Sequence, residues 1–330
     1  MPEVVRFHQL GGPENLVFED LPTAVPGPGE AKLRIHAVGM NRAESMYYHG
    51  YYIEQPILPS RIGYEASGVV EAVGEGVDKS WIGKQVATVP GFSQNKYGLL
   101  GKEAIVPASS LAEYPAKLSA EEGAGIWMQY LTAWGALVHF GKVAPDNFVL
   151  ITAATSSVGL AAIQIVKDAG AVAIATTRSS GKRDALLKLG ADHVIATEEE
   201  DLVARVKEIT GGKGARIIFD PVAGPWVETL AKAAAYQGTI FEYGILSLEP
   251  TPFPIMEALP RGIAVRGYII SEITGDPKVF PEAKKYIYDR LADGRFKPEI
   301  DRVFPLEQVI EAYRYLESNQ QIGKLVLKVK

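Results

Sequence analysis

The chain of 330 residues contains no cysteine. This absence excludes disulfide bonds, thiolate zinc sites and cysteine nucleophiles together. The chain also lacks any run of eighteen apolar residues, so we expect no transmembrane helix and no membrane partner. Its first residues show no charged stretch followed by an apolar stretch, the pattern of a secretory signal. Together these absences predict a cytoplasmic protein.

An excess of basic charge is missing as well. The chain has 34 Lys and Arg against 39 Asp and Glu, which gives a formal net charge of −5. Such a balance provides no general attraction for a phosphate backbone, so we expect no nucleic-acid partner. The five histidines show no paired spacing of the kind that holds a metal, and we expect no metal site. They are His8, His36, His49, His139 and His193.

One segment of the chain, residues 148–178, carries most of the information. It contains a short apolar run, a turn of small residues, a helix-period segment that ends at Gly170, and a second apolar run. This order is that of the first strand–helix–strand unit of a dinucleotide-binding sheet.

The turn of this unit departs from the G-x-G-x-x-G pattern. Its three glycine positions hold Ala154, Ser156 and Gly159, so only the glycine that permits close helix–strand packing is present. We expect Ser156, Ser157, Val158 and Gly159 to hold a pyrophosphate through backbone amides at the start of the helix. The alternative is an ordinary strand–helix–strand unit without a ligand.

The acidic residue that normally ends the second strand of such a unit is absent. Thr177-Arg178-Ser179-Ser180 stands there, with Lys182 following. A carboxylate would bind the ribose 2′-hydroxyl of NAD, whereas cations and hydroxyls suit the 2′-phosphate of NADP. We therefore expect Arg178, Ser179 and Lys182 to bind that phosphate and NADPH to be the cofactor.

The C-terminal half alternates short apolar runs with helix-patterned segments. This alternation predicts a parallel sheet covered on both faces, and six strands make a doubly wound Rossmann domain over residues 123–272. Beyond the first unit, the strand-like runs are residues 193–196, 215–220, 238–244 and 265–270, and the helical segments are 181–189, 201–210 and 226–236. An apolar strand at 265–270 would leave an exposed sheet edge, which predicts a homodimer built on that edge.

The first 120 residues have a different pattern. Apolar runs are separated by Pro- and Gly-rich turns, with no long helical period, which predicts an antiparallel, barrel-like β domain over residues 1–122. Residues 273–330 are expected to pack back on this domain. They include helical patterns at 281–292 and 307–318 and strand-like runs at 302–305 and 324–329.

Eight motifs spread over the chain are shared with a known family. They are Gly11–Glu14, Gly39–Asn41, Gly63–Val70, Thr132–Trp134, Ala153–Gly159, Leu189–Asp192, Ile209–Gly214 and Gly323–Leu327. In these the whole chain resembles the medium-chain dehydrogenase/reductase superfamily, in its zinc-free quinone oxidoreductase (zeta-crystallin-like) branch. The resemblance implies an α/β protein with a GroES-like β-barrel catalytic domain, a Rossmann domain and a homodimeric state.

The resemblance also implies an enzyme without a metal. In the superfamily's alcohol dehydrogenases a Cys and a His bind zinc, but the matching positions here hold Asn41 and Tyr64. Glu65, beside them, is expected to be a structural carboxylate. Without a Lewis acid an alcohol is not readily ionised. Quinones and α,β-unsaturated carbonyls instead accept hydride at carbon and spread the charge onto oxygen, where hydrogen bonds can stabilise it.

Two residues are expected to act in catalysis by this resemblance. Asn41 matches the family's active-site asparagine, and Tyr52 resembles the tyrosine that donates a proton in related enoyl reductases. The alternative for Tyr52 is an aromatic side chain that anchors a loop.

Further residues are expected to contact the nicotinamide end of the cofactor. Lys324 matches a lysine that reaches the ribose or pyrophosphate, although a lone lysine near a terminal strand is also typical of a solvated charge. The other residues carried over from the family are Thr132, Tyr243, Gly244 and Ser247.

The resemblance favours an NADPH-dependent quinone or enone oxidoreductase and leaves alternatives open. An enoyl-thioester reductase would use the same Tyr52 and would need space for a pantetheine arm. A zinc-free alcohol or carbonyl oxidoreductase is a further possibility within the superfamily. The non-enzymatic alternative is an NADPH-binding protein that binds RNA or serves as a crystallin.

Overall fold

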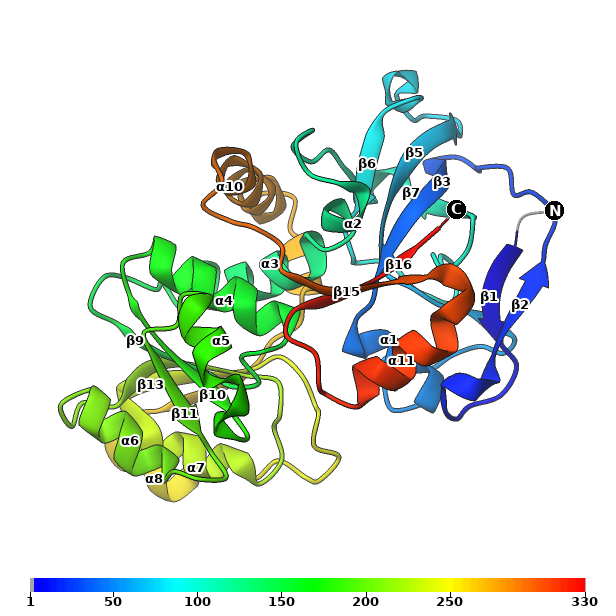
Figure 1. The fold of residues 1–330 in the computed structure, drawn as a ribbon. Coiled ribbons are helices and arrows are strands. Elements are labelled where there is room, and N and C mark those ends of the chain that lie inside the picture. The colour runs from blue at the N-terminus through cyan, green and yellow to red at the C-terminus, as the bar shows by residue number, and fades with distance from the viewer. Residues whose placement is uncertain (1–2, 330) are drawn as a thin grey trace. The chain divides into compact units, whose positions relative to one another are not determined.

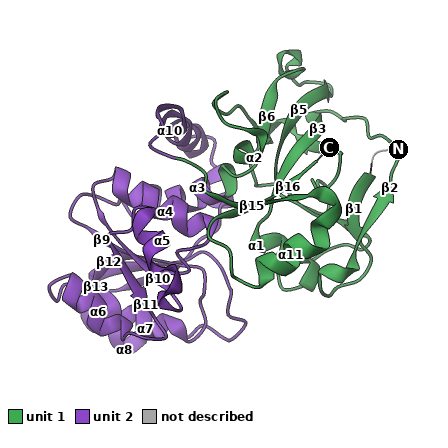
Figure 2. Cartoon of the chain, in the orientation of Figure 1, with its two compact units in different colours: residues 1–128, 297–330 green, residues 129–296 purple. Residues whose placement is uncertain are grey.

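The computed structural model describes residues 3–329, which form two compact units (Figures 1 and 2). Unit 1 combines the residues up to Met128 with those from Lys297 onward, and unit 2 comprises Gln129–Phe296. The α/β class is confirmed, with a barrel-like β unit and a doubly wound unit.

Unit 1 is built on a seven-stranded sheet and a three-stranded sheet. The larger has the order β15-β16-β3-β5-β6-β8, with β7 paired to β3, and the smaller has the order β2-β1-β4. All pairs in them are antiparallel except β15 with β16. The strands are β1 (Glu3–Phe7), β2 (Leu16–Asp20), β3 (Glu30–Gly39), β4 (Ser60–Arg61), β5 (Glu65–Val73), β6 (Gln85–Thr88), β7 (Glu103–Pro107), β8 (Leu111–Ala112), β15 (Ile300–Pro305) and β16 (Lys324–Lys328).

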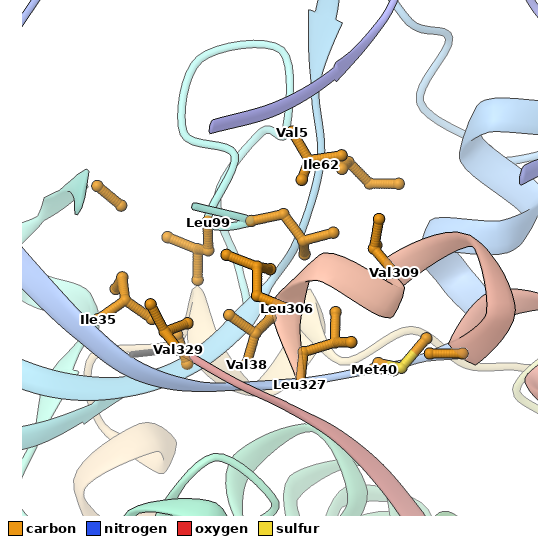
Figure 3. Packing of buried hydrophobic residues seen from close by; sticks show 14 of the residues in the cluster. Val5, Ile35, Val38, Met40, Ile62, Leu99, Leu306, Val309, Leu327 and Val329 are labelled. Carbon is orange, nitrogen blue, oxygen red and sulfur yellow. The ribbon is translucent and has the colours of Figure 1, made fainter. Parts of the chain in front are cut away.

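The core of unit 1 joins segments that are far apart in sequence. Val38 from β3 and Leu99 lie among Leu306, Val309 and Leu327 from the end of the chain (Figure 3). Each is nearly or fully buried. Burying one such side chain contributes roughly 1.5–3 kcal/mol, so the last segment is an integral part of this core.

Unit 1 also contains a helix that the sequence analysis did not predict. Helix α1 (Arg42–His49) begins at Asn41, whose side chain and Glu44 form a reciprocal capping box, and ends at Gly50, which has φ +81°. The other helices are α2 (Ala120–Gly123) and α11 (Val309–Glu317), with 3-10 turns η1 (Pro13–Asn15), η2 (Lys79–Trp81), η3 (Ala108–Ser110) and η6 (Leu306–Gln308).

Unit 2 contains a parallel sheet of six strands in the order β11-β10-β9-β12-β13-β14. In chain order this is 3-2-1-4-5-6, the Rossmann arrangement that the sequence predicts. The strands are β9 (Phe148–Ile151), β10 (Val172–Thr177), β11 (His193–Ala196), β12 (Ala215–Asp220), β13 (Ala234–Glu242) and β14 (Ala264–Gly267).

The helices of unit 2 connect and cover these strands (Figure 1). They are α4 (Ser157–Asp168), α5 (Arg183–Lys188), α6 (Leu202–Ile209), α7 (Trp226–Ala233), α8 (Ile255–Arg261), α9 (Ser271–Thr274) and α10 (Val279–Asp293), with the 3-10 turn η5 (Ser180–Lys182) and the π-helical turn η4 (Gly135–Phe140). Helix α3 (Trp127–Trp134) begins at the boundary between the units. None of the helices within residues 3–329 is long and apolar enough to cross a bilayer.

Two boundaries differ from the sequence-based expectation. Strand β14 ends at Gly267 rather than at residue 270, because the chain turns into α9, where Glu272 accepts a hydrogen bond from the Ile269 amide (3.2 Å). The return to unit 1 comes at Lys297 rather than at residue 273. Helix α10 stays in unit 2, where Arg290 pairs with the buried Asp168 of α4 (2.5 Å).

Candidate active site

Tyr52 follows the end of α1 in unit 1. Its amide donates to the Met46 carbonyl (3.1 Å), so the loop continues directly from the helix cap. Its ring is partly buried and lies 6.2 Å from the ring of Tyr64. Burial is the main cause that raises the pKa of Tyr52 to about 12. The phenol therefore keeps its proton at neutral pH and can act as a hydrogen-bond or proton donor.

Glu54 joins Tyr64 to the loop that carries Tyr52. The Tyr64 hydroxyl donates to Glu54 Oε2 (3.2 Å), and the same carboxylate accepts from the amide of Gln94 (3.1 Å) and from Asn95 Nδ2 (3.1 Å). Burial raises the pKa of Tyr64. With these donors around one carboxylate, the segment from Tyr52 to Gln55 is fixed against the residue 93–95 loop rather than free in solvent.

Asn41 is buried, and its side-chain amide is fully engaged. Its Nδ2 donates to Gly39 O and Glu44 Oε1 (both 3.2 Å), while its Oδ1 accepts from Lys324 Nζ (2.6 Å). Burial raises the pKa of Glu44 to about 7. A direct bond from Asn41 to a substrate would require one of these contacts to break, so in this geometry Asn41 links helix α1 to strand β16.

Lys324 is a buried cation in unit 1, not a solvated charge. Its Nζ lies 2.7 Å from Glu65 Oε2, and both side chains are 0% exposed. The other oxygen of Glu65 accepts from the amides of Trp127 (2.6 Å) and Met128 (3.1 Å). The expectation of a structural carboxylate at Glu65 agrees with this ion pair, which connects β5, β16 and the start of α3.

The turn after β9 is shaped to approach an anion. Ala153 has φ +45°, and Ser156 caps helix α4 by accepting the Gly159 amide on its hydroxyl (3.1 Å). A Cβ on Gly159 would lie 2.6 Å from the Ala154 Cα, which is why only glycine fits there. The amides of Ser157 and Val158, in the first turn of α4, bond to no group within residues 3–329. They are free to bind a phosphate.

The remaining predicted cofactor residues of unit 2 lie on several elements. Arg178 and Ser179 are exposed after β10, and Lys182 lies in η5. Gly244 follows β13, where a Cβ would lie 2.9 Å from the Pro221 carbonyl oxygen. Because the sheet is parallel, the carboxyl ends of β9, β10 and β13 meet at one edge, which brings these loops together.

Three further predicted residues, Tyr243, Ser247 and Thr132, also lie in unit 2. The ring of Tyr243 stacks on Phe219, with centroids 3.9 Å apart, and the amide of Ser247 donates to the Val222 carbonyl (2.8 Å). Thr132 is buried in α3, whose Leu131 carbonyl accepts from the Tyr268 hydroxyl (3.2 Å). Helix α3 also contacts α4, the helix that follows the turn after β9, because the Tyr130 hydroxyl donates to Gln164 Oε1 (2.8 Å).

The sequence analysis missed a pair of carboxyl groups in unit 2. Asp220 and Glu242 are register neighbours on β12 and β13. Asp220 accepts from the amides of Val222 (2.9 Å) and Ala223 (2.7 Å). Burial, followed by the charge of Asp220, raises the pKa of Glu242 to about 9, so Glu242 is neutral at neutral pH. The sequence signal that could have revealed this pair is that each of two successive predicted strands ends in or contains an acidic residue, Asp220 and Glu242.

Glu44 and Glu54 were missed as well. The pattern Asn41-x-x-Glu44 is a capping-box signature and could have revealed helix α1. Glu54 offers no sequence signal, because its partners belong to a distant loop. Asn95, for example, is 41 positions away in the sequence. Within residues 3–329, no three or more His, Asp or Glu side chains are grouped so as to hold a metal ion.

Comparisons with known proteins agree with this architecture. The model of the alcohol dehydrogenase GroES-like domain matches residues 27–139, and that of the zinc-binding dehydrogenase family matches residues 157–287. The chain is 30% identical to a 2-haloacrylate reductase from a Burkholderia species, over 97% of each sequence.

Two solved structures are similar over the full length. The quinone oxidoreductase of Escherichia coli complexed with NADPH has a TM-score of 0.91 and 30% identity, with 99% of each chain covered. A structure described as an NAD-dependent alcohol dehydrogenase has a TM-score of 0.90 and 33% identity, with 100% of each chain covered.

Proposed function

Since the chain belongs to the quinone oxidoreductase branch of the medium-chain dehydrogenase/reductase superfamily, we propose that it reduces quinones or α,β-unsaturated carbonyls with NADPH and without zinc. One observation carries the proposal. Unit 1 contains a phenol that keeps its proton, that of Tyr52, while the positions that match the family's zinc ligands hold Asn41 and Tyr64.

The turn after β9 fits the pyrophosphate of a nicotinamide cofactor. The free amides of Ser157 and Val158 point out of the first turn of α4, where the helix dipole favours an anion. Gly159 keeps the turn close to the helix, and Arg178 offers an exposed guanidinium to a 2′-phosphate. NADPH would supply the hydride.

Tyr52 would complete the reduction of an activated double bond. Hydride addition at the β-carbon of an enone leaves an enolate, which needs a hydrogen bond at oxygen or a proton at the α-carbon. Tyr52 can give either, since burial keeps its proton on the phenol. Tyr64 and Glu54 support this role by holding the loop that carries it.

The residues around Asn41 favour this chemistry over alcohol oxidation. Ionising an alcohol requires a Lewis acid or a strong base near its oxygen. Instead, the Lys324 ammonium already bonds both Asn41 and Glu65, so a cation occupies the space between these two positions. A second cation at this place would be repelled.

A substrate screen tests the proposal. Purified protein is mixed with NADPH, and the loss of absorbance is followed with quinones, enones, enals, enoyl-CoA thioesters and simple ketones. We expect turnover with quinones or enones and none with simple ketones. Turnover restricted to enoyl-CoA would instead support an enoyl-thioester reductase. Reduction of ketones or oxidation of alcohols would contradict the proposal.

A further inference from the structure

A carboxylate reaches the end of β10 from the neighbouring strand. Glu199, in the turn after β11, accepts from the amide of Ser180 (2.8 Å) and from its hydroxyl (3.1 Å) on the same oxygen. Ser180 directly follows Arg178 and Ser179, where the sequence lacks the acid typical of NAD-binding units. An acidic side chain therefore lies at the end of β10, although it comes from the turn after β11.

Two arginines near this turn bind the neighbouring carboxylate rather than Glu199. Arg183 and Arg205 pair with Glu200, the next residue, with Arg205 Nε 3.1 Å from Glu200 Oε1. The Arg178 guanidinium is exposed and makes no hydrogen bond or ion pair with residues 3–329. At the end of β10 the Arg178 guanidinium is therefore available to a ligand, while the Glu199 carboxylate already accepts two hydrogen bonds from Ser180.

These contacts bear on the 2′-position of a bound cofactor. In this fold the residues just after the second strand face the ribose 2′-group. A 2′-phosphate would use the two donors of Ser180 and would be repelled by the Glu199 carboxylate. A ribose 2′-hydroxyl, in contrast, could donate to that carboxylate.

We propose that Glu199 sets the cofactor preference of this chain. Bound to Ser180, it opposes the 2′-phosphate of NADPH and accepts the ribose 2′-hydroxyl of NADH, so that Arg178 and Glu199 act in opposite directions. The inference rests on the proposed binding of a nicotinamide cofactor. It predicts that the native chain discriminates weakly between NADPH and NADH.

Cofactor binding without any acceptor tests this directly. Dissociation constants for NADPH and NADH are measured by fluorescence titration for the native protein and for Glu199→Gln. The ratio Kd(NADH)/Kd(NADPH) should rise about tenfold or more in Glu199→Gln, the factor that about 1.4 kcal/mol represents. The effect should shrink at high salt, because an exposed charge is screened.

Two further variants complete the experiment: Arg178→Ala tests the opposite effect, and Glu198→Gln is the control. Arg178→Ala should weaken NADPH binding about tenfold and leave NADH binding nearly unchanged, since it removes a charge-assisted bond. Glu198→Gln removes the same charge one residue earlier. The Glu198 carboxylate is exposed and bonds no group within residues 3–329, so this variant should keep the native ratio.

The outcomes separate the two proposals. A ratio unchanged by Glu199→Gln, with both cofactors still bound, overturns the role of Glu199 alone. An equal change in Glu198→Gln also overturns it, because the effect would then be one of general charge. Failure of the native protein to bind either cofactor overturns the proposed function, and with it this inference.

Discussion

Tyr52 is the residue whose replacement best separates proton donation from packing. Tyr52→Phe removes only the hydroxyl, so kcat for an enone that needs protonation should fall on the order of 10²–10⁴-fold. A quinone should suffer much less, because water can protonate its hydroquinone anion. NADPH affinity should barely change. Steady-state kinetics with both acceptors, and NADPH titration, provide the measurements.

The neighbouring Tyr51 is the matched control for this prediction, because it is 54% exposed. Tyr51→Phe should leave both reactions nearly unchanged. An equally large loss for enone and quinone in Tyr52→Phe would indicate a positioning role, and no loss for either would make Tyr52 a packing residue.

The buried pair of Lys324 and Glu65 predicts a large loss of stability on removal of one charge. Lys324→Met leaves an uncompensated carboxylate in the core, which costs about 3–5 kcal/mol. The free energy of unfolding from denaturant titration measures it. Lys328→Met, which removes an exposed cation of the same strand, should change stability little. Equal effects in the two variants would contradict the buried ion pair.

Glu242 predicts a pH dependence of stability. Its pKa is about 9 in the folded chain against an ordinary 4.5, so between these values the folded state binds more protons than the unfolded state. Stability contributed by this group therefore falls as pH rises from about 4.5 to 9. Glu242→Gln should melt near the native Tm at pH 5 and above it at pH 9. Parallel curves of Tm against pH would contradict this.

Local motifs predicted which residues belong to the site better than they predicted the contacts and burial of those residues. Arg178 and Gly159 follow from local spacing and lie at the predicted edge of the sheet. The burial of Lys324 could not be predicted locally, since its partner Glu65 is 259 positions away. Glu199 was missed for a similar reason, because the acid was sought on the second strand and comes from the turn after the third.

At the scale of elements, strand–helix alternation predicted unit 2 well because each parallel strand is a short apolar run between helices. Helix α1 was missed because eight residues are too few to show a clear helical period, and it is stabilised by its caps and by packing. The position of α10 depends on Arg290 and Asp168, a contact across 122 positions that no local pattern contains.

Strand β14 and helix α8 predict a homodimer. Strand β14 is an edge of its sheet. Helix α8 and the loop before it, which lead into β14, expose several large apolar side chains, and soluble proteins avoid such surfaces unless a partner covers them. They are Leu248 (65%), Phe253 (57%), Met256 (81%) and Leu259 (74%). Light scattering at micromolar concentration should give the mass of a dimer.

Single charges introduced into this surface should dissociate the dimer. Met256→Glu places a carboxylate in the apolar patch and should yield monomers. Leu187→Glu is the control, because Leu187 is 42% exposed on α5, away from β14. A monomeric native protein would exclude this assembly.

At the scale of the whole molecule, the absence of cysteine predicts the metal content. By the resemblance to the superfamily's alcohol dehydrogenases, Asn41 and Tyr64 occupy the positions of zinc ligands, and the Lys324 ammonium bonds Asn41 and Glu65. Elemental analysis of the purified protein should find no stoichiometric zinc, and chelators should leave activity unchanged. One zinc per chain, with activity lost on chelation, would contradict the zinc-free assignment.

Strand β16 also determines the order in which the molecule can assemble on the ribosome. It lies between β15 and β3 in the sheet of unit 1, yet it is translated only after all of residues 129–296. Until then, the apolar faces of β3 and β5 lack Leu325 and Leu327, and Glu65 lacks its cation. Unit 2 is continuous and can fold as soon as it emerges. The nascent chain can therefore complete its second unit before its first, whose sheet stays open until β16 has been translated.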